Sequence, residues 1–402
     1  MIRIIEMSAA LFVLACGGGG GTTTTQPQQV ASVVITPASA SVAMGHTTTL
    51  AAAAKGAASE TLAGRTIAWS SSAVPIATVS SAGVVTGIAP GTATITATSE
   101  GKSATASITV TVPTTPQARW LAAMVYDDAQ NRVLMFGGFT SNGSSLGPLN
   151  DLWAWDGARW SFLGVGGPPA RGDMLAAWDS ARRRFVIYGG ADNDGPRGDT
   201  WEWDGTAWTQ RATGGPSIRR HFAGGFDGAH GRVVLYGGLV GTSDTPALDT
   251  WEWDGQQWAQ RATTTPGGFS PPAPASNLVY SETRRALLML VGTFTSGPSA
   301  LWQWNGSTWT SVGAGPTTSM PVPIAATGAD EITLLLQSGA TLRWQGSGFT
   351  QVAAAGPPSM LGSVIYDRAH ARLVHFGGLA GSSTTAETWL WDGSTWALAP
   401  GR

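Results

Sequence analysis

Trp153-Ala154-Trp155-Asp156-Gly157-Ala158-Arg159-Trp160 is the stretch that decides the fold, because its pattern, Trp-x-Trp-Asp-Gly-x-x-Trp, returns again and again toward the C-terminus. Copies begin at Trp153, Trp201, Trp251, Trp302, Leu342 and Trp389, and the copy at Leu342 has lost two of its tryptophans. The steps between copies are 48, 50, 51, 40 and 47 residues. A period of this length is typical of repeats that each fold as one small sheet.

The composition indicates an all-β protein of two domains. A chain of 402 residues is long for a single core. Its 19 Trp, 54 Gly and 23 Pro, with only 12% charged residues, favour short strands joined by turns over long amphipathic helices. The formal net charge is -2 and lysine occurs only at Lys55 and Lys102, which excludes the basic surface that nucleic acid binding needs.

The N-terminus reads as an export signal. Residues 1–15 combine Arg3 with an apolar run that is too short to span a bilayer. The run ends in Val13-Leu14-Ala15-Cys16, which resembles the lipobox of bacterial lipoproteins. The resemblance implies cleavage before Cys16, lipid on that residue, and a location in the bacterial cell envelope as an outer-membrane or cell-surface lipoprotein. The alternative is an ordinary secretion signal followed by an incidental cysteine.

Two linkers and a small domain follow. Residues 16–29 are rich in Gly and Thr and predict a flexible linker, and residues 113–118 predict a short stiff one. Between them, residues 30–112 alternate apolar and polar side chains, which predicts a small β-sandwich with Trp69 as its core plug. The run from Trp69 through Pro90-Gly91-Thr92 to Ile95 resembles the bacterial Ig-like group 2 (BIG2) domain. The resemblance implies a spacer or adhesive module.

Each repeat contains four strand-like pieces. The first carries small residues, as expected where strands converge around an axis. The second is a continuous apolar run, as in 133–138, which predicts a strand buried on both faces. Two glycines close this run in units one, two, three and six, and Val291-Gly292 and Ser338-Gly339 replace the pair in units four and five. The Trp motif supplies the third and fourth, with a reversal at Asp156-Gly157.

Four hydrophobic residues, a double glycine and two spaced aromatics resemble the kelch repeat, and the resemblance covers residues 119–402. The fold class we predict is therefore all-β, with a six-bladed kelch-type β-propeller preceded by a small Ig-like β-sandwich. Unit five keeps only Ala340-Thr341 between its glycine and Leu342, where other units have nine to fourteen residues. We expect a notch in that face of the propeller.

The candidate ligand-binding residues are arginines at one register. Arg119, Arg171 and Arg219 each stand seven residues before the aromatic residue of the inner strand, and Arg220 and His221 adjoin the third. Together they predict a cationic ring for a carboxylate, a sulfate or an acidic loop. In some kelch domains arginines in this place contact acidic partners. The alternative is that each arginine pairs with a loop aspartate of its own or the next unit; Asp151, Asp199 and Asp249 precede the motif as loop acceptors.

The sequence offers no catalytic residues, no metal site and no cofactor site. Asp192-Asn193-Asp194-Gly195 lacks the downstream glutamate of a calcium loop, and five scattered histidines form no metal-binding pattern. The copper site of galactose oxidase, a kelch enzyme, needs a cysteine bonded to a tyrosine, whereas the single cysteine here is Cys16.

These observations predict a non-catalytic, lipid-anchored envelope protein whose propeller binds an extracellular protein or glycan. The Ig-like domain serves as spacer or adhesive module, and the N-terminal lipid contacts the membrane. The alternative is a surface enzyme that acts on an acidic sugar, similar to the kelch-type sialic-acid isomerases, through the arginines and an acid such as Asp173.

Overall fold

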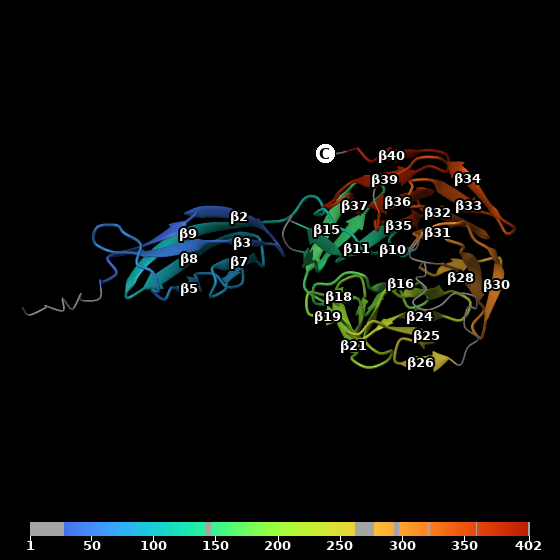
Figure 1. The fold of residues 1–402 in the computed structure, drawn as a ribbon, viewed down its shortest axis with the longest axis horizontal. Helices are drawn as coiled ribbons and strands as arrows, with labels where there is room; N and C mark the ends of the chain where they lie inside the picture. The colour runs from blue at the N-terminus through green and yellow to red at the C-terminus, as the bar shows by residue number, and fades with distance from the viewer. Residues whose placement is uncertain are drawn as a thin grey trace, which may run out of the picture. The chain divides into compact units, whose positions relative to one another are not determined.

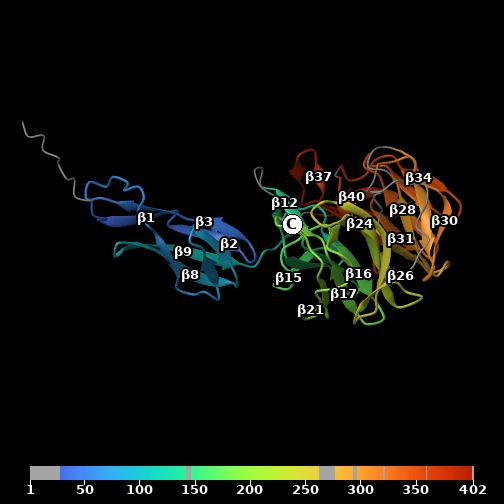
Figure 2. The same cartoon turned by 60° about the horizontal axis from the view of Figure 1, so that its bottom comes forward.

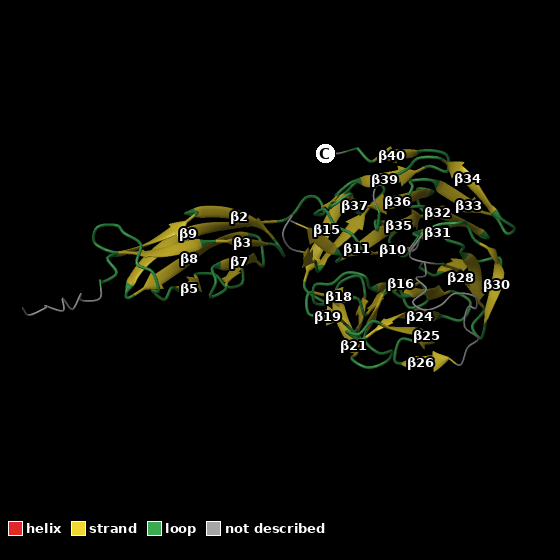
Figure 3. Cartoon of the chain, viewed as in Figure 1, coloured by secondary structure: helices red, strands yellow, loops and turns green. Residues whose placement is uncertain are grey.

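The computed structural model describes residues 28–141, 146–261, 277–292, 297–319, 322–358 and 360–400, and within these ranges every regular element is a β-strand (Figures 1 and 3). The chain divides into two compact units; the smaller takes in Thr47–Thr86 and Gly91–Thr109, and the larger runs from Val110 onward. In the same ranges no helix has the length and apolarity to cross a membrane. The expected signal of residues 1–15 and Cys16 lie outside the described residues.

The smaller unit is a β-sandwich. Its core consists of alternate residues of the longer strands, such as Ile95 and Ile108, which are 0% exposed, because successive side chains of a strand point to opposite faces. Trp69 is only partly buried, so the prediction that it plugs the core is wrong. The sheets are β1-β4, β2-β9-β8-β5 and β3-β7-β6. The strands are β1 (Ser32–Thr36), β2 (Ser39–Ala43), β3 (Thr47–Thr49), β4 (Ala51–Lys55), β5 (Ala68–Ser71), β6 (Ala77–Val79), β7 (Val84–Gly87), β8 (Gly91–Ser99) and β9 (Lys102–Thr111).

In the larger unit, the described residues form six antiparallel sheets of four or five strands, each from one stretch of chain, besides three two-stranded hairpins. We number the six sheets one to six in chain order. Sheet one consists of β10 (Ala123–Asp127), β11 (Arg132–Phe136), β14 (Asp151–Trp155) and β15 (Trp160–Val165). Sheet two consists of β16 (Leu175–Asp179), β17 (Arg184–Tyr188), β20 (Thr200–Trp203) and β21 (Trp208–Ala212). Sheet three consists of β22 (Arg219–Arg220), β23 (Ala223–Asp227), β24 (Arg232–Val240), β25 (Thr245–Trp253) and β26 (Trp258–Arg261).

Sheets four to six repeat the plan. Their strands are β27 (Val279–Ser281), β28 (Ala286–Val291), β29 (Ala300–Trp304) and β30 (Trp309–Ala314); β31 (Ile324–Gly328), β32 (Glu331–Leu335), β33 (Thr341–Trp344) and β34 (Phe349–Ala353); and β35 (Ser363–Asp367), β36 (Arg372–Phe376), β39 (Thr388–Trp391) and β40 (Trp396–Leu398). One strand of each sheet, which we call its inner strand, contacts the inner strand of the next sheet. The inner strands in chain order are β10, β16, β23, β27, β31 and β35, and β35 also contacts β10 (Figure 1).

The second strand of each sheet is buried on both faces, as its unbroken apolar sequence predicts. Val133, Leu134, Met135 and Phe136 of β11 are all 0% exposed. The double glycine that follows is needed for close approach: Gly137 has a φ of 63°, and a Cβ there would lie 2.5 Å from the carbonyl oxygen of Arg171 in the next sheet.

The motif aspartate closes a four-residue loop, because Trp155 pairs directly with Trp160. Oδ1 of Asp156 accepts hydrogen bonds from the backbone N–H groups of Ala158 and Arg159, both at 2.9 Å. The two-residue Asp-Gly reversal expected from the sequence is therefore wrong in detail, and an Asx turn takes its place.

Tryptophans hold neighbouring sheets together. Nε1 of Trp258 donates to Oγ1 of Thr200 in the preceding sheet at 2.8 Å, and the same bond joins Trp309 to Thr250 and Trp396 to Thr341. Sheet one makes this bond to sheet six: Trp160 donates to Thr388 at 2.9 Å. The last sheet thus meets the first through the contact that joins consecutive sheets.

Short hairpins stand on one side of the larger unit, where the second strands of sheets one, two and six end. They are β12 (Phe139–Ser141) with β13 (Leu146–Pro148), β18 (Ala191–Asp192) with β19 (Gly195–Pro196), and β37 (Leu379–Ala380) with β38 (Ser383–Thr384). In sheet three the long strands β24 and β25 fill the same role. Figure 2 shows β12 and β37 on the same side of the unit. We call this side the hairpin face.

Sheet five has no additional hairpin between its second and third strands. A tight turn joins β32 directly to β33, and in it the backbone N–H of Leu336 donates to the carbonyl of Ala340 at 2.9 Å. The short connection expected from Ala340-Thr341 is confirmed. The hairpin face is therefore lower at sheet five.

Candidate functional site

The three arginines of the predicted ring are buried and bound within their own sheets. Their side chains are 0%, 0% and 1% exposed for Arg119, Arg171 and Arg219. Arg119 makes a bidentate pair with Asp151, with N–O distances of 2.6 and 2.7 Å, and also donates to the carbonyls of Gln117 and Gly137. Arg171 pairs with Asp199, and Arg219 with Asp249, in the same way.

These arginine–aspartate pairs lower the pKa of each aspartate. Burial by itself raises the pKa of the Asp151 carboxyl, but the charge and hydrogen bonds of Arg119 and the indole N–H of Trp153 outweigh it and lower the pKa overall. The pKa values of Asp199 and Asp249 are lowered by the corresponding partners. The arrangement is the alternative stated from the sequence, an arginine paired with a loop aspartate of its own unit. It leaves these arginines no exposed face for a ligand.

A cavity of 440 Å³ opens where the inner strands begin, on the hairpin face. We call it the axial cavity. Most of its wall is apolar, and its hydrogen-bonding side chains besides Trp120 are Asp173, His221, Asn277, Gln337 and Ser363. The apolar lining comes from five of the sheets and the segments that precede their inner strands: Trp120, Leu121, Ala122, Ala123, Met124, Met174, Ala176, Phe222, Val322, Pro323, Ile324, Met360, Leu361 and Val364.

Four residues at one repeat position form the rim of this cavity. Leu121, Asp173, His221 and Leu361 have φ values of 50°, 57°, 55° and 59°, a left-handed conformation that is uncommon for residues other than glycine. Backbone hydrogen bonds join them around the rim: Leu121 donates to the carbonyl of Leu361 at 3.0 Å, and Asp173 to that of Leu121 at 3.1 Å. The rim is therefore held in shape by contacts between sheets.

An ion pair spans two sheets at the rim. Nδ1 of His221 lies 2.7 Å from Oδ2 of Asp173, and the backbone N–H of His221 donates to the same oxygen at 3.1 Å. The hydrogen bond to Asp173 raises the pKa of His221, and burial opposes this only in part. Next to it, Arg220 pairs with Asp244.

Five positions were predicted from the sequence to bind a ligand: Arg119, Arg171, Arg219, Arg220 and His221. Only His221 lines the cavity, and Arg220 is its neighbour in the chain. Cys16 was predicted only as the lipidation site. The structure adds Asn277, Gln337 and Ser363. Sequence reasoning missed these because each stands alone in its repeat, with no motif around it. Their common location depends on how separate sheets meet.

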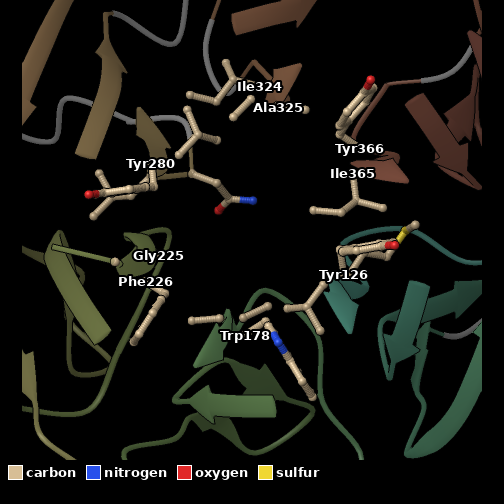
Figure 4. A pocket seen from close by; sticks show the side chains of 18 of the residues that line it. Tyr126, Trp178, Gly225, Phe226, Tyr280, Ile324, Ala325, Ile365 and Tyr366 are labelled. Carbon is tan, nitrogen blue, oxygen red and sulfur yellow. The ribbon is translucent and has the colours of Figure 1, made fainter. Parts of the chain in front are cut away.

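The opposite end of the axis carries aromatic residues on the inner strands of five sheets (Figure 4). They surround a cavity of 200 Å³ and are Tyr126, Trp178, Phe226, Tyr280 and Tyr366. Hydrogen bonds tie two of them to another sheet: Trp178 donates to Asp128, next to β10 of sheet one, at 2.7 Å, and the Tyr126 hydroxyl accepts from the backbone of Ala369, next to β35 of sheet six, at 3.0 Å. These contacts give the aromatic residues a packing role, so we place the candidate site on the hairpin face.

The described residues contain no group of three or more His, Cys, Asp and Glu side chains that could hold a metal ion. The Asp192 carboxylate, considered for calcium from the sequence, is engaged by Arg197, whose Nε donates to it at 2.7 Å. Chemically, the axial cavity provides an apolar space, one acid–imidazole pair and four neutral hydrogen-bonding side chains, those of Trp120, Asn277, Gln337 and Ser363.

Comparison with known families identifies one segment. Residues 29–110 match the family model of the bacterial Ig-like domain (group 2). No curated protein matches the chain. The Ig-like prediction for the N-terminal domain is confirmed, and such domains are typical of extracellular or surface proteins.

Proposed function

We propose that the six sheets of the larger unit form a closed six-bladed propeller of the kelch type. The seam between sheets one and six supports this, because three contacts that join consecutive sheets recur there. Gly138 donates to the carbonyl of Arg171 at 2.8 Å, and Gly378 to that of Arg119 at 2.7 Å. Arg171 donates to the carbonyl of Leu149 at 2.9 Å, and Arg119 to that of Thr385 at 3.1 Å. The Trp160–Thr388 bond is the third.

The protein's function, in our proposal, is non-catalytic binding at the bacterial cell envelope. A lipid on Cys16 anchors the chain, the Ig-like domain is a spacer or adhesive module, and the propeller binds an extracellular protein or glycan with its hairpin face. The observation that carries this proposal is the 440 Å³ axial cavity, surrounded by hairpins and lined by a mostly apolar wall with a few convergent polar groups. That combination is typical of ligand sites.

The test is a search for partners with the purified full chain on arrays of glycans and envelope proteins. We expect binding that Arg220→Glu weakens, because the change breaks the pair with Asp244 on the hairpin face. Ser180→Glu, at the opposite end of the axis, is the matched control and should bind normally. If both variants bind every partner as the unchanged protein does, the hairpin face is not the binding surface.

The contact between Asp173 and His221 favours one alternative, a surface enzyme acting on an acidic sugar, because an acid–imidazole pair at a cavity is suited to proton transfer. An enzyme of this kind would turn over sialic-acid or uronic substrates and lose that turnover in Asp173→Ala and His221→Ala. A binding protein shows no turnover in any of the three forms.

A further inference from the structure

The wall of the axial cavity disfavours a sugar inside it. A pyranose carries several hydroxyl groups around the edge of its ring, and each buried hydroxyl without a partner costs about 1–3 kcal/mol in proteins. The wall supplies hydrogen-bonding side chains at only a few places, and the hydroxyl of Ser363 already donates to the carbonyl of Ala122 at 2.7 Å. A ligand whose buried part is apolar therefore fits this wall better than a sugar does.

The wall is also adaptable. Met124, Met174 and Met360 all line it. Methionine is unbranched and fills irregular space, so a set of methionines accepts apolar groups of different shapes. Met124, Ala176 and Asn277 line both cavities, so the two cavities lie next to each other.

Of the two residues of the rim ion pair, the histidine is the more exposed. The side chain of His221 is 38% exposed, whereas that of Asp173 is 16% exposed. The charged groups around His221 are Asp173, Arg220 and Asp244, and Arg220 and Asp244 are bound to each other. Nδ1 of His221 is turned to Asp173, which leaves Nε2 as the nitrogen available to a ligand. When the ring is protonated, Nε2 donates a hydrogen bond, and its natural partner is an anionic oxygen.

We propose that the axial cavity binds a small amphipathic carboxylate, with its apolar body among the methionines and its carboxylate at Nε2 of His221. The inference rests on the proposed function in one respect, that the hairpin face is the binding face. It adds the chemical class of the ligand. No covalent step is involved.

The first test compares head groups on the unchanged full chain by calorimetry, with decanoate, decanol and decyltrimethylammonium below their aggregation concentrations. We expect decanoate to bind at least tenfold more tightly than decyltrimethylammonium at pH 6. Shortening decanoate to octanoate should weaken binding by about fourfold for each methylene removed. Equal binding of the carboxylate and the ammonium compound, or no dependence on chain length, would overturn the proposal.

The second test uses matched variants. Ala176→Phe places a ring inside the cavity, and we expect it to reduce decanoate affinity by at least tenfold. Ser180→Phe, which lines only the far cavity, should bind decanoate normally. His221→Asn keeps a residue that tolerates the left-handed backbone, and it should abolish the preference for decanoate over decanol while decanol still binds. Unchanged decanoate binding in both Ala176→Phe and His221→Asn would refute the assignment.

The two proposals fail separately. The calorimetry needs no protein or glycan partner, so a carboxylate that binds as expected supports this inference even if the arrays find nothing. Array partners that bind Ala176→Phe normally, together with absent decanoate binding, leave the proposed function standing and reject the carboxylate.

Discussion

At the scale of single residues, the larger unit is stabilised by charges that are hidden from solvent. The guanidinium of Arg119 and the carboxylate of Asp151 have side-chain exposures of 0% and 4%. Removing one partner of such a pair leaves an uncompensated charge in a low-dielectric interior. We expect Asp151→Asn to lower the free energy of unfolding by about 3–5 kcal/mol, measured by urea denaturation.

The control for that substitution is an exposed pair of the same kind. Arg159 and Asp156 have side-chain exposures of 65% and 51%. Solvent screens their attraction, so Arg159→Ala should change the free energy of unfolding by less than about 1 kcal/mol. A similar loss in both variants would mean that burial does not decide the strength of these pairs.

The His221–Asp173 pair makes the stability of the folded protein depend on pH in the opposite direction to the buried carboxylates such as Asp151. The pKa of His221 in the folded protein is raised above its ordinary value of 6.5 by Asp173. Its contribution to stability is therefore fully present below pH 6.5 and is lost as pH rises through the raised pKa. An NMR titration should show a histidine ring with a midpoint above 6.5 that is absent from the spectrum of His221→Asn. A midpoint at or below the ordinary value contradicts the ion pair.

At the scale of strands and sheets, the Trp–Thr bonds depend on which residues face each other. Where sheet four has Leu301 in place of threonine, sheet five has Phe349 in place of tryptophan, so neither donor nor acceptor is present. Thr388→Val would leave the indole N–H of Trp160 without its acceptor, and we expect a loss of about 1–3 kcal/mol in unfolding free energy. Adding Trp160→Phe should recover part of that loss, as the Leu301–Phe349 combination indicates; no recovery in the double variant would contradict the bond's role.

The sequence predicted most of these elements because their causes are local. The Trp motif, the apolar run and the double glycine each set a strand or a turn through neighbouring residues, and the structure has strands at those places. The loop at Asp156 is longer than the sequence predicted. It has four residues instead of two, because Oδ1 of Asp156 accepts a hydrogen bond from the backbone N–H of Ala158 and so closes a wider turn. The axial cavity could not be predicted, because Asn277 and Gln337 meet the rim only after separate sheets have packed together.

At the scale of the whole larger unit, the seam between sheets six and one decides whether the unit opens. The amide of Gly378 bonds across the seam at 2.7 Å, as that of Gly138 bonds between sheets one and two at 2.8 Å. We expect hydrogen exchange of the two amides to slow to a similar degree, measured by NMR or mass spectrometry. Exchange at Gly378 that is more than about tenfold faster than at Gly138 would mean that the seam opens on its own.

Among the described residues of the larger unit, the strands of each of the six sheets come from one stretch of chain, and sheets one and six have no strand in common. A gene segment that encodes one run therefore carries a whole sheet, together with the tryptophan that joins it to its neighbour. Duplication or deletion of such a segment changes the number of sheets without leaving any strand half-paired. The architecture can therefore be inherited in whole modules, and the fifth copy, with Leu342 and Phe349 in place of two tryptophans, shows how far the sequence of one module can diverge.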